Sequence, residues 1–328
     1  MYMNNNYYSL GLMSGTSGDG IDASIIKSDG QNQYESVVDG YFEYNLKTQE
    51  NIHNLKDKIA NSSIRLMEFS EEINSLEKNI TLFHAEVVND IKKGIKENID
   101  FLGFHGQTIL HSPTNGVTKQ LGDGKLLSEL TKKTVIYNFR QNDLKNGGQG
   151  APLTPVFHRL LQSKYKLNLP LIILNIGGIA NVTGIDIEGH IYSQDIGPGN
   201  CLIDYWIRNN SKKKYDEEGK IASSGKINKK ILNQALENFS QKNIIKSYDV
   251  KDFDLSFVRG LSLEDGAATL TEYTSEILYN HIKMSRDELK ENILISGGGR
   301  KNKLLIKRIE EKINTSIKLV DDYGINGD

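Results

Sequence analysis

Three glycine-rich segments each follow directly after a short apolar run: Gly11–Gly20, Asn175–Gly178 and Ser296–Gly299. Glycine lets backbone amides approach an anion closely, and it adopts the positive φ angles that such turns need. Any one of these turns can be explained as a simple connection between strands. Because they recur in both halves of the chain, we expect that they bind the phosphates of one nucleotide from two lobes.

Other phosphate-binding motifs are missing from the sequence. It contains no G-x-x-x-x-G-K-[ST] P-loop, and no G-x-G-x-x-G stands between a strand and a helix of a βαβ unit. The segment Gly15–Gly20 is predicted to join two strands instead of opening a helix. This arrangement is typical of actin-like nucleotide sites and differs from P-loop and Rossmann sites.

The apolar pattern of the first half predicts the elements that position the first turn. Apolar residues at steps of three and four from Ile73 to Ile95 mark one face of a long amphipathic helix. Strands are predicted on both sides of the turn and again before and after the helix. These strands are Leu10–Met13, Ile21–Ile26, Tyr34–Tyr44, Phe101–Phe104 and Thr134–Tyr137.

A similar order of elements returns in the second half. Strands are predicted at Leu169–Leu174, Ala180–Ile185, Ile191–Ser193 and Ile293–Ile295, and helices at about 228–241, 263–284 and 301–312. Two rounds of strand, glycine turn, strands and helix indicate a duplicated α/β architecture with a cleft between two lobes. We place the division near residue 165, so the lobes are 1–165 and 166–328.

Composition limits the classes of function. A length of 328 residues suits two packed lobes. Forty basic and 42 acidic residues give a net charge of -2, whereas proteins that bind nucleic acid usually carry a clear excess of basic residues. The single cysteine, Cys201, cannot form an intramolecular disulfide, and we expect it to pack as a small apolar residue instead of acting as a nucleophile. No secretory leader and no apolar run of about 20 residues is visible, so we expect a cytoplasmic protein without a membrane partner.

Motifs spread over residues 11–328 are more specific than the turns alone. They are Gly11–Ser17 with Asp19–Asp22, Phe104–Ile109 with His111, Phe139–Asp143 with Gly147–Pro155, Asn175–Thr183, Asp195–Asn200, Gly297–Gly299 and Tyr323–Asp328. In kind and order they resemble the anhydro-N-acetylmuramic acid kinase family.

The resemblance implies an actin/hexokinase-like fold, that is, a two-lobed, duplicated ribonuclease H-like ATPase fold. It also implies ATP with Mg²⁺ and the amino-sugar substrate 1,6-anhydro-N-acetylmuramic acid from peptidoglycan turnover. The family opens the anhydro bridge with water and phosphorylates the 6-hydroxyl in one process.

The resemblance also assigns the nucleotide site. The ATP-binding turn is carried over as Gly15, Thr16, Ser17, Gly18, Asp19, Gly20, Ile21 and Asp22, the second turn as Gly177 and Gly178, and the adenosine turn as Gly297, Gly298 and Gly299. Asp19 or Asp22 would hold the metal through water, and the sequence does not choose between them.

Asp195 is expected to be the catalytic base, because opening the anhydro ring requires a water molecule that loses a proton. The alternative is an aspartate that caps the Gly197–Gly199 turn and the helix starting near Leu202. Arg140 suits an anionic lactyl carboxylate or a transferring phosphate, or else it is a structural arginine. His105 and Gln107 follow a predicted strand and are expected to reach the sugar, with a structural histidine as the alternative for His105.

Some residues depart from the family pattern. Gly18 stands where a larger apolar residue is usual, and we expect it to loosen the first turn. Asn138 replaces a common aspartate and receives no catalytic role. The family continues into a helical segment with a glutamate, whereas this sequence ends at Asp328. We therefore expect the 328 residues to bind nucleotide and to turn over the sugar poorly, and we expect a homodimer because the family forms them.

Two other functions agree with parts of the pattern. A kinase of the same fold that acts on another sugar or small acid would share the nucleotide turns. It would not need the segments 104–111 and 139–155 in this form. A nucleotide-switched binding protein would need a polymer interface or an appended domain, for which the chain leaves no length.

Overall fold

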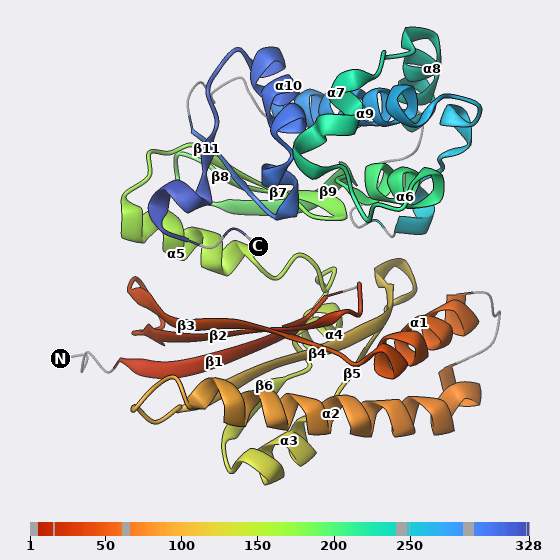
Figure 1. Ribbon diagram of the computed structural model, residues 1–328. Helices are drawn as coiled ribbons and strands as arrows, with labels where there is room; N and C mark the ends of the chain where they lie inside the picture. Colours follow the sequence, from red (N-terminus) through yellow and green to blue (C-terminus); the bar gives the residue numbers. More distant parts are fainter. Residues whose placement is uncertain are drawn as a thin grey trace. The chain divides into compact units, whose positions relative to one another are not determined.

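The structure is a computed structural model that describes residues 6–15, 17–60, 66–240, 248, 250–284, 292–325 and 327. Its contacts divide the chain into two compact units, Met1–Ala151 and Pro152–Asp328 (Figure 1). Thr16, Asn326 and Asp328 lie outside the described residues, so the parts of the predicted site that include them have no structural description.

A mixed sheet forms the centre of the first unit. β1 (Tyr7–Ser14), β2 (Gly20–Ser28) and β3 (Tyr34–Glu43) are antiparallel neighbours. β1 also pairs in parallel with β4 (Phe101–Ser112), which pairs in parallel with β6 (Thr134–Tyr137). β5 (Val117–Leu121) is antiparallel to the second half of β4. Buried and exposed residues alternate along β1, so one face of this strand packs into the core.

Helices complete the core of the first unit. α2 (Ser70–Lys92) buries the predicted apolar face, including Ile73, Leu76 and Ile80, and this confirms the long amphipathic helix. The other helices of this unit are α1 (Leu46–Ala60), α3 (Gly124–Thr131) and α4 (Phe139–Lys145). Side chains of α1 and α2 share one apolar core with β1, β2 and β4.

The second unit repeats the strand order of the first. β7 (Leu171–Ile176), β8 (Ile179–Ile185) and β9 (Ile191–Pro198) are antiparallel neighbours. β7 pairs in parallel with β10 (Ile293–Ser296), and β10 pairs in parallel with β11 (Lys318–Leu319). The order β11-β10-β7-β8-β9 corresponds to β6-β4-β1-β2-β3, with the same relative directions. This duplication confirms the predicted ribonuclease H-like, actin-like α/β fold.

Helices lie on both faces of the second sheet (Figure 1). α9 (Leu263–Met284) and α10 (Lys303–Ile313) share an apolar core with β7, β8 and β10. α5 (Pro155–Tyr165) packs on β8 and β9, as the contacts between these elements show. The remaining helices are α6 (Cys201–Asn210), α7 (Lys220–Ser224) and α8 (Lys229–Ser240). Because α5 packs on this sheet, the division falls between Ala151 and Pro152, before α5, whereas the sequence pattern placed it near residue 165.

Short segments connect these elements. The 3-10 helices lie at Leu66–Phe69, Pro113–Asn115, Glu217–Gly219, Val250–Asp252, Ser256–Val258, Gly298–Lys301 and Val320–Tyr323. Cys201 is buried at the start of α6, and burial raises the pKa of its thiol to about 12. It therefore packs as a small apolar residue, as predicted. None of the helices in the described ranges is long and apolar enough to cross a bilayer.

Candidate active site

The first glycine turn joins the antiparallel strands β1 and β2, as predicted. The amide of Gly18 donates to the carbonyl of Gly15 over 3.2 Å, and the hydroxyl of Ser17 donates to the carboxylate of Asp19 over 2.6 Å. Gly18 has a φ of +69°, and a Cβ atom there would lie 2.9 Å from Cγ2 of Ile52. A larger residue would therefore not fit at this position unless Ile52 moved, while the expectation that Gly18 loosens the turn stays a prediction.

Buried polar side chains form a hydrogen-bonded cluster against this turn. Oε1 of Gln107 accepts from the hydroxyl of Ser14 over 2.6 Å, and Nε2 of Gln107 donates to the carbonyl of Gly15 over 2.7 Å. The hydroxyl of Ser14 also lies 3.0 Å from that of Tyr44, and burial raises the pKa of Tyr44 above its ordinary value. Gln107 is fully buried. The structure thus places Gln107 against the turn Gly15–Gly20, and its expected contact with the sugar stays a prediction.

The other carried-over residues of this turn divide into exposed carboxylates and a core residue. Asp19 and Asp22 are exposed, whereas Ile21 is fully buried in the core of the first unit. Ile21 can therefore reach a nucleotide only through its backbone. Burial, together with the charge of Asp19, raises the pKa of Tyr41 to about 12. A magnesium ion is typically held by one or two carboxylates and the substrate phosphates, which the exposed Asp19 and Asp22 fit.

The second glycine turn packs against the first residues of α6. The carbonyl of Gly177 accepts from the amide of Asn200 over 2.8 Å. The carbonyl of Gly178 accepts from the amides of Gly199 and Cys201 over 2.9 Å and 3.1 Å. Both carbonyl groups are therefore bonded to the backbone that leads into α6. Whether the amide groups of this turn bind an anion stays a prediction.

The third glycine turn lies against the second. A Cβ atom at Gly299 would lie 2.3 Å from Cγ2 of Ile176, and one at Gly297 would lie 2.6 Å from the carbonyl oxygen of Ile176. Gly297 also has a φ of +82°. Both glycines are needed because β7 and β10 are parallel neighbours and end side by side. These two turns are therefore adjacent within the second unit, while their sharing of one nucleotide with the first turn stays a prediction.

Asp195 lies inside β9 and is half-buried. The sequence placed it before a glycine-proline turn, and this was wrong: β9 continues through Pro198, and its pairing with β8 shifts register next to Asp195. Oδ2 of Asp195 accepts from the amide of Tyr248 over 2.9 Å. The N-cap position of α6, for which Asp195 was an alternative, is occupied by Asn200. The catalytic assignment of Asp195 stays a prediction.

Arg140 and His105, both assigned to the substrate, contact each other. Nε of Arg140 donates to Nε2 of His105 over 2.8 Å, and Nη1 of Arg140 donates to the carbonyl of Gly150 over 2.6 Å. Burial, together with the charge of Arg140, lowers the pKa of His105 to about 4. His105 is therefore neutral, and its Nδ1 donates to the carbonyl of Gly106 over 2.6 Å. The histidine orients the guanidinium, and whether either residue binds the sugar stays a prediction.

Sequence reasoning assigned no role to several residues that shape these sites. Asp143 closes the loop that follows α4 by accepting from the amide of Gly150 over 2.7 Å. Its place in the motif Phe139–Asp143 is a signal that points to it. Ser14 directly precedes Gly15 in the first motif, whereas no local pattern marks Tyr44 as a partner of Ser14.

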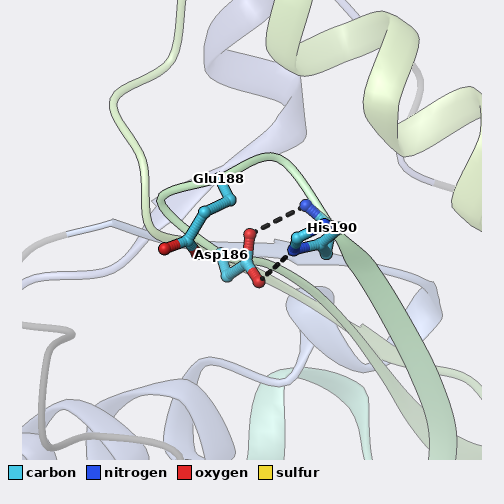
Figure 2. Close-up of side chains that lie close together, drawn as sticks. All are labelled: Asp186, Glu188 and His190. Atoms are coloured by element: carbon cyan, nitrogen blue, oxygen red, sulfur yellow. Dashed lines mark hydrogen bonds and ion pairs between the residues drawn. The ribbon is translucent and has the colours of Figure 1, made fainter.

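One group in the described part of the chain has the spacing of metal ligands. Asp186, Glu188 and His190 have ligand atoms within 4.8 Å of one another, at the turn between β8 and β9 (Figure 2). Asp186 accepts from the amide of His190 over 2.7 Å, and its other carboxylate oxygen lies 3.1 Å from Nδ1 of His190. Glu188 and His190 are exposed. These contacts close a hairpin, and exposed groups of this kind are common without a metal.

Comparisons of the sequence with known proteins agree on one family. A family model described as anhydro-N-acetylmuramic acid kinase matches residues 7–328. The protein of that name from Pelagibacter ubique is 50% identical over 98% of this chain and 88% of its own length. The one from Zymomonas mobilis is 36% identical over 97% of this chain and 88% of its own length. A solved structure, component A of (R)-2-hydroxyglutaryl-CoA dehydratase from Acidaminococcus fermentans, is 12% identical, with a TM-score of 0.48, over 95% of this chain and 91% of that one. The fold assignment rests on the strand order and not on this last likeness.

Proposed function

The chain belongs to the anhydro-N-acetylmuramic acid kinase family, and on that premise we propose that it phosphorylates 1,6-anhydro-N-acetylmuramic acid with ATP. The observation that carries the proposal is the match of the family over residues 7–328, with 50% identity to one relative over nearly the whole chain. The product is N-acetylmuramic acid 6-phosphate, and the reaction belongs to peptidoglycan recycling.

The reaction combines hydrolysis with phosphoryl transfer. The oxygen of a water molecule bonds to the anomeric carbon C1, and the C1–O6 bond of the anhydro bridge breaks. O6 then bonds to the γ-phosphorus of ATP, whose bond to the β,γ-bridging oxygen breaks to leave ADP. One proton of the attacking water must pass to a base. The protein therefore has to activate water at one end of the sugar and orient phosphates at the other.

Backbone groups of the glycine turns bind the nucleotide in this proposal. The turn Gly15–Gly20 is held in shape by Gln107 and Ser14, and the turn Gly177–Gly178 directs its carbonyl groups toward α6. Preorganised amides bind phosphate without further ordering, which lowers the cost of binding. A magnesium ion held through Asp19 or Asp22 would neutralise charge on the transferring phosphates.

Asp195 is the base that takes the proton of the attacking water. Its carboxylate is half-buried in a strand, where the backbone fixes its position, and the amide of Tyr248 donates to one of its oxygens. A fixed carboxylate within reach of the water is what general-base catalysis requires. Arg140 binds the lactyl carboxylate of the sugar, because its guanidinium is oriented by His105 and Gly150.

The test is a coupled assay of ADP release with the anhydro sugar, N-acetylmuramic acid and N-acetylglucosamine as separate substrates. We expect turnover with the anhydro sugar, and we expect Asp195→Asn to lower kcat by at least 10³-fold with ATP affinity unchanged. Asp186→Asn is the matched control, because it changes a hydrogen-bonded aspartate at the far end of β8 and should keep full activity. Turnover of other sugars alone would indicate a kinase with a different substrate. Near-normal turnover in Asp195→Asn would assign the base to another carboxylate.

The resemblance to the family also supports two properties of the whole protein. We propose that it forms a homodimer and that it works in the cytoplasm, where ATP is available. Light scattering of the purified protein tests the first property, and a mass of one chain, 36.8 kDa, would contradict it.

A further inference from the structure

Asn181 lies directly opposite Asp195. It is the third residue of β8, just after the second glycine turn, and it pairs with Asp195 in the antiparallel register of β8 and β9. Opposite residues of such a pair point to the same face, and their Cβ atoms are about 4.5–5.5 Å apart. The side chains of Asn181 and Asp195 are therefore close enough to bind one small group together.

The side-chain oxygen of Asn181 is buried and accepts no hydrogen bond from the described residues. A buried polar atom without a partner costs free energy, so most such atoms in proteins have one. The next pair on the same face satisfies its polar groups: Oγ1 of Thr183 lies 2.8 Å from Nδ1 of His158, and Ser193 donates to the carbonyl of Val182 over 2.8 Å. The unsatisfied acceptor thus occurs at the pair that includes the proposed base.

A register shift marks this pair as unusual within the sheet. Asn181 pairs with Asp195, but Ala180 pairs with Gly197, so Ile196 is an extra residue in β9. Such bulges change the direction of a neighbouring side chain and are frequent beside active sites. The shift lies immediately next to Asp195, on the side of the pair that leads to the second glycine turn.

We propose that Asn181 is a catalytic residue that binds the attacking water together with Asp195, an inference that rests on the proposed function. A water molecule has two O–H groups. One donates to the carboxylate of Asp195, which takes that proton, and the other donates to Oδ1 of Asn181. With both protons directed at the protein, a lone pair of the water oxygen points away from both acceptors and toward the anomeric carbon. The C1–O bond then forms as the C1–O6 bond breaks.

Two substitutions at Asn181 separate this role from a structural one. Asn181→Leu keeps the size of the side chain and removes the acceptor, so kcat should fall by about 10- to 100-fold with ATP affinity unchanged. Asn181→Asp places a second carboxylate beside Asp195. A like charge at about 5 Å, with an effective dielectric constant of about 20, raises a pKa by roughly two units. The acid limb of the kcat/KM profile should therefore move by about two pH units to higher pH.

Thr183→Val is the matched control, because it removes a buried hydroxyl two residues along the same strand without approaching Asp195. It should lower the melting temperature and leave kcat and the pH profile unchanged. The inference is overturned if Asn181→Leu and Asn181→Asp keep the wild-type kcat and acid limb, or if Thr183→Val shows the same kinetic losses as they do. The proposed function itself fails in a different way, through absence of turnover in the wild type or full activity of Asp195→Asn.

Discussion

Replacing Gln107 with leucine tests whether this residue positions the nucleotide turn or contacts the sugar. In the structure its carboxamide makes three hydrogen bonds, to Ser14 over 2.6 Å, to Gly15 over 2.7 Å and to the carbonyl of Thr108 over 3.2 Å. Leucine has a similar volume, so the change removes these bonds without opening a large cavity. The effect therefore measures the hydrogen bonds and not the packing.

The size of the effect follows from what remains bonded in the variant. The carbonyl of Gly15 still accepts from Gly18, and the hydroxyl of Ser14 still contacts Gly20 and Tyr44. The lost bonds therefore contribute about 1 kcal/mol each, or about 2–3 kcal/mol in the free energy of unfolding of the first unit. The melting temperature should fall by about 5–10 °C. If ATP must then order the turn at a cost of about 2 kcal/mol, the KM for ATP rises up to about 30-fold.

Steady-state kinetics with each substrate varied in turn, together with thermal unfolding, check this prediction. Gln120→Leu is the matched control, because the side-chain amide of Gln120 donates to the hydroxyls of Thr108 and Thr118 and not to the residues of the turn. It should leave the KM for ATP unchanged. A variant Gln107→Leu with a raised KM for the sugar, and with unchanged KM for ATP and melting temperature, would refute the reasoning from the structure. It would favour the interpretation that Gln107 contacts the sugar.

Three further changes are expected to have measurable effects. Burial lowers the pKa of His158 to about 4, so between pH 6.5 and 4 the unfolded chain binds a proton that the folded chain does not. The free energy of unfolding therefore falls on acidification. His158→Gln should lose less of this free energy between pH 7 and 5 than the wild type, and equal losses would contradict the prediction. Asp321→Asn should lower the free energy of unfolding by about 2 kcal/mol in a denaturant titration, because the buried Arg300 loses its charged partner at 2.6 Å. An unchanged unfolding midpoint would show that the ion pair of Arg300 and Asp321 is dispensable. Arg140→Lys removes the N–H group that donates to His105 and the planar guanidinium with its parallel donors. The KM for the sugar should therefore rise about 10-fold or more with the KM for ATP unchanged. A raised KM for ATP with an unchanged KM for the sugar would assign Arg140 to the nucleotide.

The elements that the sequence predicted have strong local patterns. Leu171–Leu174 is an apolar run because β7 is buried on both faces between parallel and antiparallel neighbours. The face from Ile73 to Ile91 repeats with the helical period, and it became the buried face of α2. The sequence indicated the glycine turns because a positive φ or a close backbone approach excludes other residue types, as at Gly297.

Elements without such patterns were not predicted. α1 has mostly polar residues and buries a few apolar side chains, among them Ile52 and Leu55. β11 has two residues, too few for any period to appear. β4 extends to Ser112, beyond the predicted Phe104, because the chain passes Gly106 with a φ of +74° and then pairs with β5. In each case long-range pairing or packing stabilises a segment whose own composition is ambiguous.

The sequence by itself determined which residue types follow each strand, and hence that carboxylates and glycine turns occur at the ends of repeated strands. Only the tertiary structure decided which side chains meet. Gln107 is buried because Ser14 and Gly15, 93 and 92 positions away, satisfy its amide, and Asn181 faces Asp195 because β8 and β9 pair in the register of their hairpin. The physical reason is that periodicity and turn chemistry act over a few residues, whereas burial of a polar group depends on partners supplied by distant strands.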